Sequence, residues 1–170
     1  MSVGVTYLDH NASAPLLPEA RDAIVAALAL RGNPSSVHAH GRALRALIDD
    51  ARAKVATLAG ATREQVVFTG SATEAITQAI VGGARALDVG GIVVSAGEHA
   101  AVLKAAEATG LPVTTVGLDA DGRIPVEEIA AAMARADAFT AKLLVAVHLV
   151  NNETGVVQPV DRIEVLVGAS

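Results

Sequence analysis

From residue 66 onward the chain alternates between short apolar runs and longer amphipathic stretches, and this alternation restricts the possible folds more than any other feature. The short runs have the length and composition of buried strands, and the longer stretches repeat apolar residues at helical spacing. We expect strands at 66–68, 92–95, 113–116 and 143–150, and helices at 19–30, 39–59, 73–87, 100–109, 126–136 and from 161 onward. Alternating strands and helices predict an α/β fold with a largely parallel sheet and flanking helices.

Glycines mark the expected ends of two helices, at Gly60 and Gly110, and the segment 119–122 (DADG) has the composition of a turn. The apolar run at 162–167 has no capping signal, so the domain looks interrupted rather than finished. We therefore expect an N-terminal segment, 1–15, followed by an incomplete α/β domain, 16–170.

Composition excludes several classes of protein. The formal net charge is −5 without a basic block, so we expect no nucleic-acid partner. No apolar run approaches the roughly 18 residues of a membrane span, and residues 1–13 lack the features of a secretory signal, so we expect a cytoplasmic protein. The chain has no cysteine, and His10, His38 and His40 lack acidic companions at ligand spacing, so we expect no metal site.

Polar residues gather in three loops that follow expected strands, at 69–73, 96–99 and 151–155. Ligands of open α/β sheets bind beyond the carboxyl ends of the strands, so these loops are the candidate site. In the first loop, Gly70, Ser71 and Ala72 allow close approach to the backbone, and Thr73 adds a hydroxyl at a helix start. This arrangement fits a phosphate cup, or alternatively an ordinary helix capped by Ser71 or Thr73.

The other two loops carry one imidazole and two amides. His99 could stack on a flat ligand or exchange protons near neutral pH, or it could simply cap the following helix. Asn151 and Asn152 could donate hydrogen bonds to a phenolate or carboxylate, or could belong to a plain turn. We expect His148 to be a hydrogen-bonded core residue within the last strand.

Five segments, in order, resemble the motifs of the cysteine desulfurases, which are pyridoxal-phosphate (PLP) enzymes of the class V aminotransferase family. The first two resemble the family's opening loop and its GNPSSxH signature, and the others resemble its phosphate loop, its EHxAVL segment and its VNNExGxxQP segment. They lie at 7–12, 32–38, 68–74, 98–103 and 150–159. The resemblance covers nearly the whole chain.

The resemblance implies part of the large domain of an aspartate aminotransferase-like, PLP-dependent transferase. It implies that the backbone of Ala72 and Thr73, with the Thr73 hydroxyl, holds the cofactor phosphate. It further implies that His99 stacks on the pyridine ring and helps to move protons as a catalytic residue. Asn152 would donate to the phenolic oxygen and lie near the substrate carboxylate.

Two details depart from the family pattern. The phosphate loop reads Gly70-Ser71-Ala72-Thr73 where the family usually has S-G-A-T, and Ile76 and Thr77 stand where the family often has two asparagines. In the family a lysine in a serine-x-histidine-lysine context, an aspartate and a mobile cysteine come from a later part of the chain. The three lysines here, Lys54, Lys104 and Lys142, are not in that context.

The resemblance therefore predicts the N-terminal part of a homodimeric cysteine desulfurase, inactive alone. The complete enzyme would convert L-cysteine to L-alanine and pass sulfur through an enzyme persulfide to an acceptor protein, for iron–sulfur clusters or thio-cofactors. Two alternatives stay open: another class V enzyme, such as a selenocysteine lyase or an aminotransferase, and a non-catalytic remnant that acts as a binding protein.

Overall fold

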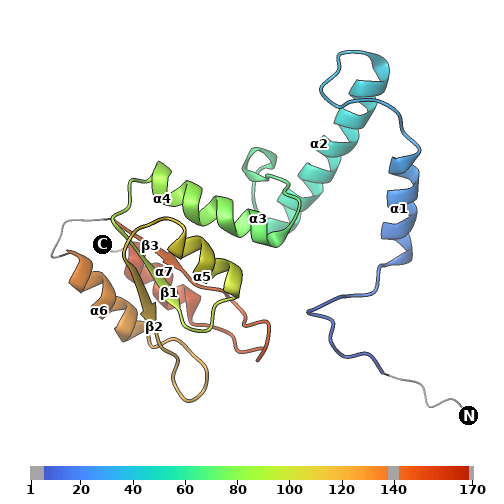
Figure 1. The fold of residues 1–170 in the computed structure, drawn as a ribbon. Helices are drawn as coiled ribbons and strands as arrows, with labels where there is room; N and C mark the ends of the chain where they lie inside the picture. The colour runs from blue at the N-terminus through green and yellow to red at the C-terminus, as the bar shows by residue number, and fades with distance from the viewer. Residues whose placement is uncertain (1–5, 138–141, 169–170) are drawn as a thin grey trace, which may run out of the picture. The chain divides into compact units, whose positions relative to one another are not determined.

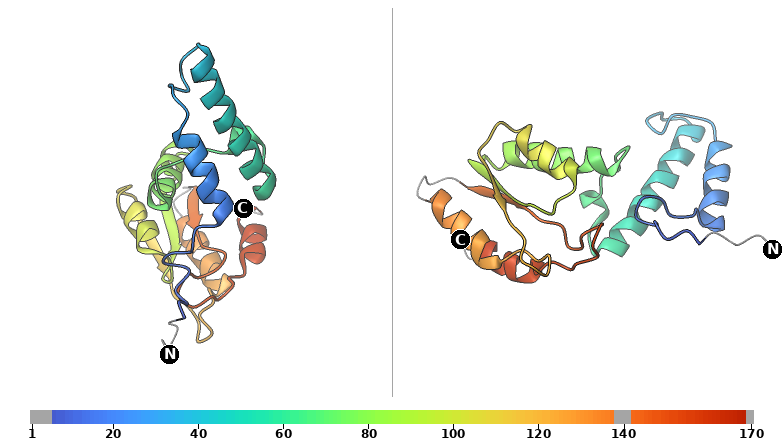
Figure 2. Two further views of the ribbon diagram at one scale, coloured as in Figure 1. Left: turned by 90° about the vertical axis from the view of Figure 1, so that its right-hand side faces the viewer. Right: turned by 60° about the horizontal axis from the view of Figure 1, so that its bottom comes forward.

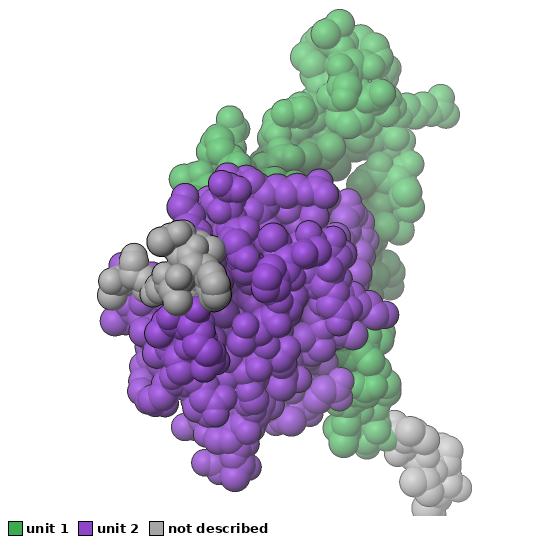
Figure 3. Space-filling view, turned by 60° about the vertical axis from the view of Figure 1, so that its left-hand side comes forward, with its two compact units in different colours: residues 1–68 green, residues 69–170 purple. Residues whose placement is uncertain are grey.

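The computed structural model describes residues 6–137 and 142–168. The chain divides into two compact units, Met1–Phe68 and Thr69–Ser170, which Figure 3 distinguishes by colour. The three loops of the candidate site begin at residue 69, so all of them belong to the second unit. The expected division after residue 15 stays a prediction.

Over residues 6–68, the first unit contains two helices and one short 3-10 turn: α1 (Pro18–Leu28), α2 (Ala39–Ala59) and η1 (Arg63–Gln65). The bounds predicted for α2 are confirmed. They could be predicted because each end of the helix has a local capping signal. At its start, His38 Nδ1 accepts a hydrogen bond from the Gly41 amide (3.3 Å), and at its end Gly60 adopts the left-handed conformation (φ 65°).

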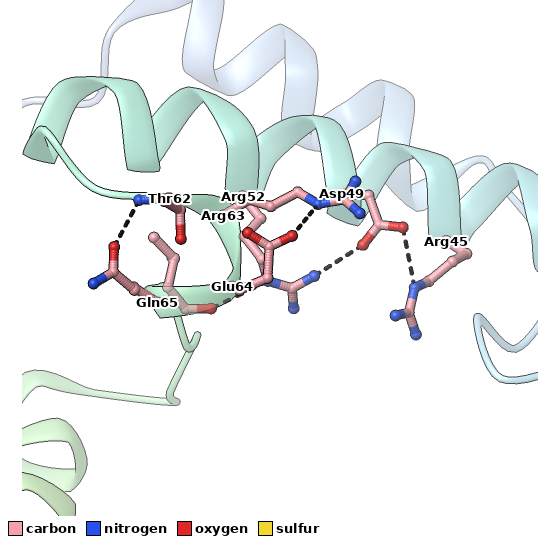
Figure 4. A network of polar contacts seen from close by, with 8 residues as sticks. Arg45, Asp49, Arg52, Thr62, Arg63, Glu64 and Gln65 are labelled. Atoms are coloured by element: carbon pink, nitrogen blue, oxygen red, sulfur yellow. Dashed lines mark hydrogen bonds and ion pairs between the residues drawn. The ribbon is translucent and has the colours of Figure 1, made fainter.

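A network of polar contacts links α2 to the segment that follows it (Figure 4). Asp49 accepts hydrogen bonds from Arg45 (3.2 Å) and Arg52 (2.9 Å) on the same helix. Arg52 also donates from Nε to the carbonyl of Val66 (3.2 Å), and its guanidinium lies 5.5 Å from the centre of the Phe68 ring.

The strand expected at 66–68 is therefore wrong. Val66 has extended backbone (φ −95°, ψ 121°), but its carbonyl is occupied by an arginine side chain, and the segment pairs with no strand in the described part of the chain. Val67 and Phe68 are exposed. An apolar run becomes a strand only where a neighbouring strand satisfies its backbone, and this requirement is invisible in the local sequence.

The second unit is built on a parallel sheet of three strands in the order β2-β1-β3 (Figure 1). The strands are β1 (Gly91–Ser95), β2 (Val113–Val116) and β3 (Leu143–Ala146), and every residue of β1 is buried. The predicted α/β fold with a parallel sheet is confirmed. The last strand is shorter than the predicted 143–150, because after Ala146 the chain leaves the ladder for contacts with other loops.

Helices cover both faces of this sheet (Figure 2). On one face, Ile92 and Val94 pack in a core with α5 (Ala100–Glu107) and the helical stretch α3 (Ala72–Thr77), η2 (Gln78–Gly82) and α4 (Gly83–Ala86), in which η2 is a π-helical turn. On the other face, Val93 packs against α6 (Val126–Asp137) and α7 (Val160–Gly168). The side-chain alternation of β1 thus supplies two cores, as expected for a doubly covered sheet.

Candidate functional site

The candidate site lies where the loops after β1 and β3 leave the sheet. These two strands are neighbours, but the loop after β1 leads to α5 on one face while the loop after β3 leads to α7 on the other. In an open α/β sheet the usual ligand site lies at such a divergence, beyond the carboxyl ends of the strands. The stretch that begins at α3 packs beside α5 and also starts at this edge (Figure 1).

The two asparagines after β3 have different environments. Asn151 is buried: its Nδ2 donates to the Gly97 carbonyl (3.0 Å), and its Oδ1 accepts from the amides of Glu153 and Thr154 (2.8 Å each). Asn152 is exposed, and its Nδ2 donates to the Glu153 carboxylate at 3.2 Å. The turn alternative therefore describes Asn151, while Asn152 is the exposed amide of this loop.

His99 is exposed and is the N-cap residue of α5. Its Nδ1 accepts a hydrogen bond from the Ala101 amide (3.1 Å), so the capping alternative is confirmed for this nitrogen. In a neutral imidazole one nitrogen accepts and the other carries the hydrogen, so this contact assigns the hydrogen of neutral His99 to Nε2. The cap orients the ring and leaves Nε2 as the nitrogen available to a ligand.

The start of α3 combines a capped helix with free donors. Ser71 Oγ accepts from the Glu74 amide (3.2 Å), and the Glu74 carboxylate accepts from the Gly70 amide (2.8 Å), so Ser71 is the N-cap residue. The amides of Ala72 and Thr73 have no acceptor among the residues described, and both residues are exposed. Capping by Ser71 therefore leaves two backbone donors and the Thr73 hydroxyl for an anion.

These groups match the chemistry of PLP, which combines a phosphate, a flat ring and a phenolic oxygen. Two amides and a hydroxyl suit the phosphate, an oriented imidazole suits the ring, and an exposed amide suits the oxygen. In the described parts of the chain, no three acidic, histidine or cysteine side chains come together as metal ligands would.

Sequence reasoning missed the contribution of Glu98. Its side chain is only 2% exposed, and its Oε1 accepts from the His148 amide (3.0 Å) and pairs with His148 Nδ1 (2.8 Å). His148 is hydrogen-bonded as predicted, but it lies beyond the end of β3 rather than inside a strand. The only signal was a carboxylate placed directly after a buried strand, and its partner lies 50 residues away along the chain.

The family of the chain follows from comparison with known proteins. The family model for class V aminotransferases matches residues 6–169, and the chain belongs to this family. It is 37% identical over 163 residues to a putative cysteine desulfurase, IscS 1, of Bacillus subtilis (strain 168). It is 40% identical over 163 residues to a cysteine desulfurase of Cereibacter sphaeroides. These alignments cover 92% and 91% of this chain but only 42% and 41% of the relatives.

Solved structures give the same result. A NifS-like protein superposes with a TM-score of 0.82 at 28% identity, covering 95% of this chain and 44% of the other. A protein described as SspA in complex with cysteine superposes with a TM-score of 0.85 at 28% identity, covering 97% and 48%. The predicted resemblance to cysteine desulfurases is confirmed, and the chain spans less than half the length of these relatives.

Proposed function

We propose that this chain forms the cofactor-binding part of a PLP-dependent cysteine desulfurase. The observation that carries the proposal is the coincidence of two findings. Relatives matched over nine-tenths of the chain are cysteine desulfurases, and the residues that resemble their PLP contacts are exposed, at the start of α3 and in the loops after β1 and β3. One similar structure is described as a complex with cysteine, which supports L-cysteine as the substrate.

Each residue has a role that its geometry allows. The amides of Ala72 and Thr73, with the Thr73 hydroxyl, hold the phosphate at the start of α3. His99 stacks on the ring in the orientation set by its cap, with Nε2 as the nitrogen that exchanges a proton. Asn152 donates its amide hydrogen to the phenolic oxygen. When bound, PLP supplies an electron sink for chemistry at the substrate's α-carbon.

The complete reaction needs more than these 170 residues contain. The chain has no cysteine to accept the sulfur, and none of its lysines lies in the family's serine-x-histidine-lysine context. We propose that these groups belong to the larger part of the enzyme, which acts as a homodimer and passes sulfur to an acceptor protein for iron–sulfur cluster or thio-cofactor assembly. We propose a cytoplasmic location for the complete enzyme. Separately, no helix in the described ranges has the length and apolar character to cross a bilayer.

The first test is binding of PLP to the purified 170-residue protein, followed by its absorption spectrum. We expect reversible binding that depends on the phosphate, so pyridoxal should bind much more weakly than PLP. T73A removes a hydrogen bond to a charged group and should weaken PLP binding about tenfold or more. T77A, one turn further along the same helix, is the matched control and should bind as the wild type does.

Two results would contradict the proposal. The first is equal affinity for PLP and pyridoxal, with T73A indistinguishable from T77A, because the phosphate would then not be held at α3. The second is a PLP–lysine imine that borohydride reduces to a stable amine and that mass spectrometry maps to Lys54, Lys104 or Lys142. That adduct would place the cofactor lysine inside this chain and would overturn its assignment to the rest of the enzyme.

A further inference from the structure

Side-chain hydrogen bonds join the loop after β1 to the loop after β3. Asn151 donates from Nδ2 to the Gly97 carbonyl (3.0 Å), and Glu98 Oε1 accepts from the backbone amide of His148 (3.0 Å) and lies 2.8 Å from its Nδ1. The joined residues are at least 50 positions apart in the sequence, so these contacts hold together loops that the chain connects only distantly.

Burial alternates along both loops. Glu98 and Asn151 are buried, whereas the residues that directly follow them, His99 and Asn152, are exposed. Each exposed residue that we assign to the cofactor ring is therefore one peptide unit away from a buried anchor. A displacement of an anchor moves the exposed residue with it, because a peptide unit is rigid.

The Glu98–His148 contact is suited to fix a position. Glu98 Oε1 accepts from the backbone amide of His148 and lies within ion-pair distance of its Nδ1, so it contacts both the backbone and the ring of that residue. A hydrogen bond to a charged acceptor is shorter and stronger than a neutral one. His148 Nε2 is buried and has no hydrogen-bond partner in the described residues, so the polar contact of this ring is made through Nδ1.

We propose that Glu98 and His148 form a clasp that sets the position of His99 relative to Asn152, and that they are positioning residues for the ring of the cofactor. This inference rests on the proposed function and extends it to two residues with no contact to the cofactor of their own. The protein groups assigned to the cofactor phosphate lie on α3, which is a different segment. The clasp therefore acts on the contacts with the ring and leaves the contacts with the phosphate unchanged.

Two substitutions of His148 distinguish a loss of positioning from a general loss of folded structure. Asn places its Nδ2 near the position of the imidazole Nδ1, so H148N retains a donor to Glu98, whereas H148L fills the space without one. We expect H148L to weaken PLP binding at least fivefold, and H148N to stay within twofold of the wild type. Binding of inorganic phosphate, measured separately, should be unchanged in both variants.

A second readout needs no cofactor. Amide hydrogen exchange in the ligand-free protein should become at least fivefold faster at Ala101 and Glu153 in H148L, because their amides are hydrogen-bonded to His99 Nδ1 and Asn151 Oδ1, and it should stay near the wild-type rate in H148N. If the wild type does not bind PLP, the proposed function fails while this measurement still decides whether the clasp exists.

Three results would overturn the clasp. They are unchanged PLP binding and unchanged exchange in H148L, equal weakening of PLP and phosphate binding, or a failure of H148N to rescue. If H148L does not fold, E98M replaces it, since methionine keeps about the size of the side chain but removes the oxygen that accepts from His148. E98M should then show the same selective loss of PLP binding and the same faster exchange, and a wild-type result for E98M would refute the proposal.

Discussion

Gln158 belongs to the family's VNNExGxxQP motif, and the structure gives it a supporting role that can be measured. Its side chain is 3% exposed and bridges to the turn before α6, where Oε1 accepts from the Ile124 amide (2.9 Å) and Nε2 donates to the Gly122 carbonyl (2.9 Å). Ile124 is itself buried, so Q158A leaves a backbone N–H without an acceptor and away from water.

The expected loss follows from these contacts. An unsatisfied buried donor costs about 1–3 kcal/mol, and the partly buried Gly122 carbonyl adds a smaller amount, so we expect Q158A to lose about 2–3 kcal/mol of unfolding free energy. With a urea slope of about 2 kcal/mol per molar, the unfolding midpoint should fall by roughly 1 M. The assay is urea unfolding of the 170-residue protein, followed by circular dichroism.

The matched control is Gln78, an exposed glutamine whose Nε2 donates to the Glu74 carboxylate at 3.1 Å. Q78A should change stability by less than about 0.5 kcal/mol, because both groups remain hydrated. A Q158A midpoint within error of the wild type, or equal losses in the two variants, would refute the reasoning that burial makes the Gln158 bridge stabilising.

Three further outcomes test other parts of the structure. Nitrogen chemical shifts of neutral His99 should show the hydrogen on Nε2, and a hydrogen on Nδ1 would contradict the cap to Ala101. Gly110 has φ 72° with open space around it, so G110A should cost about 1 kcal/mol in urea unfolding through backbone strain alone, and an unchanged midpoint would exclude that strain. Hydrogen bonding to its own backbone amide, and then to Arg162, lowers the pKa of Glu127. A pKa that is lowered on folding stabilises the folded state at pH values above the ordinary carboxyl pKa. E127Q should therefore be less stable than the wild type at neutral pH. The difference should vanish as the pH falls through the lowered pKa, and a difference that persists in acid would contradict it.

The sequence predicted best where the cause of a structure is local. The bounds of α2 follow from stops at both ends, and the bounds of β2 follow from a short β-branched run between turns. The strand expected at 66–68 failed because pairing depends on a neighbour that the local pattern does not show. The strand expected at 143–150 was too long for a similar reason, since His148 contacts Glu98 and Asn151 contacts Gly97 instead.

The site shows the same division. The start of α3 and the position of His99 could be predicted, because a turn of small residues after an apolar run, and a histidine at a helix start, are local signals. The burial of Glu98 could not, because it depends on His148, whose place beside it is set by the sheet order. For Ser71 and His99 the capping alternative is confirmed and does not exclude the ligand alternative, which stays a prediction, since each cap uses one group.

The register of the sheet also sets an order in which the unit can assemble. Ile92 pairs with Val113 across one crossover through α5, whereas Gly91 pairs with Leu143 only after α6 has been added. Closing the shorter loop costs less chain entropy, so β1, α5 and β2 should form first. During synthesis, the contacts between the loops after β1 and β3 cannot form until β3 has emerged from the ribosome and docked.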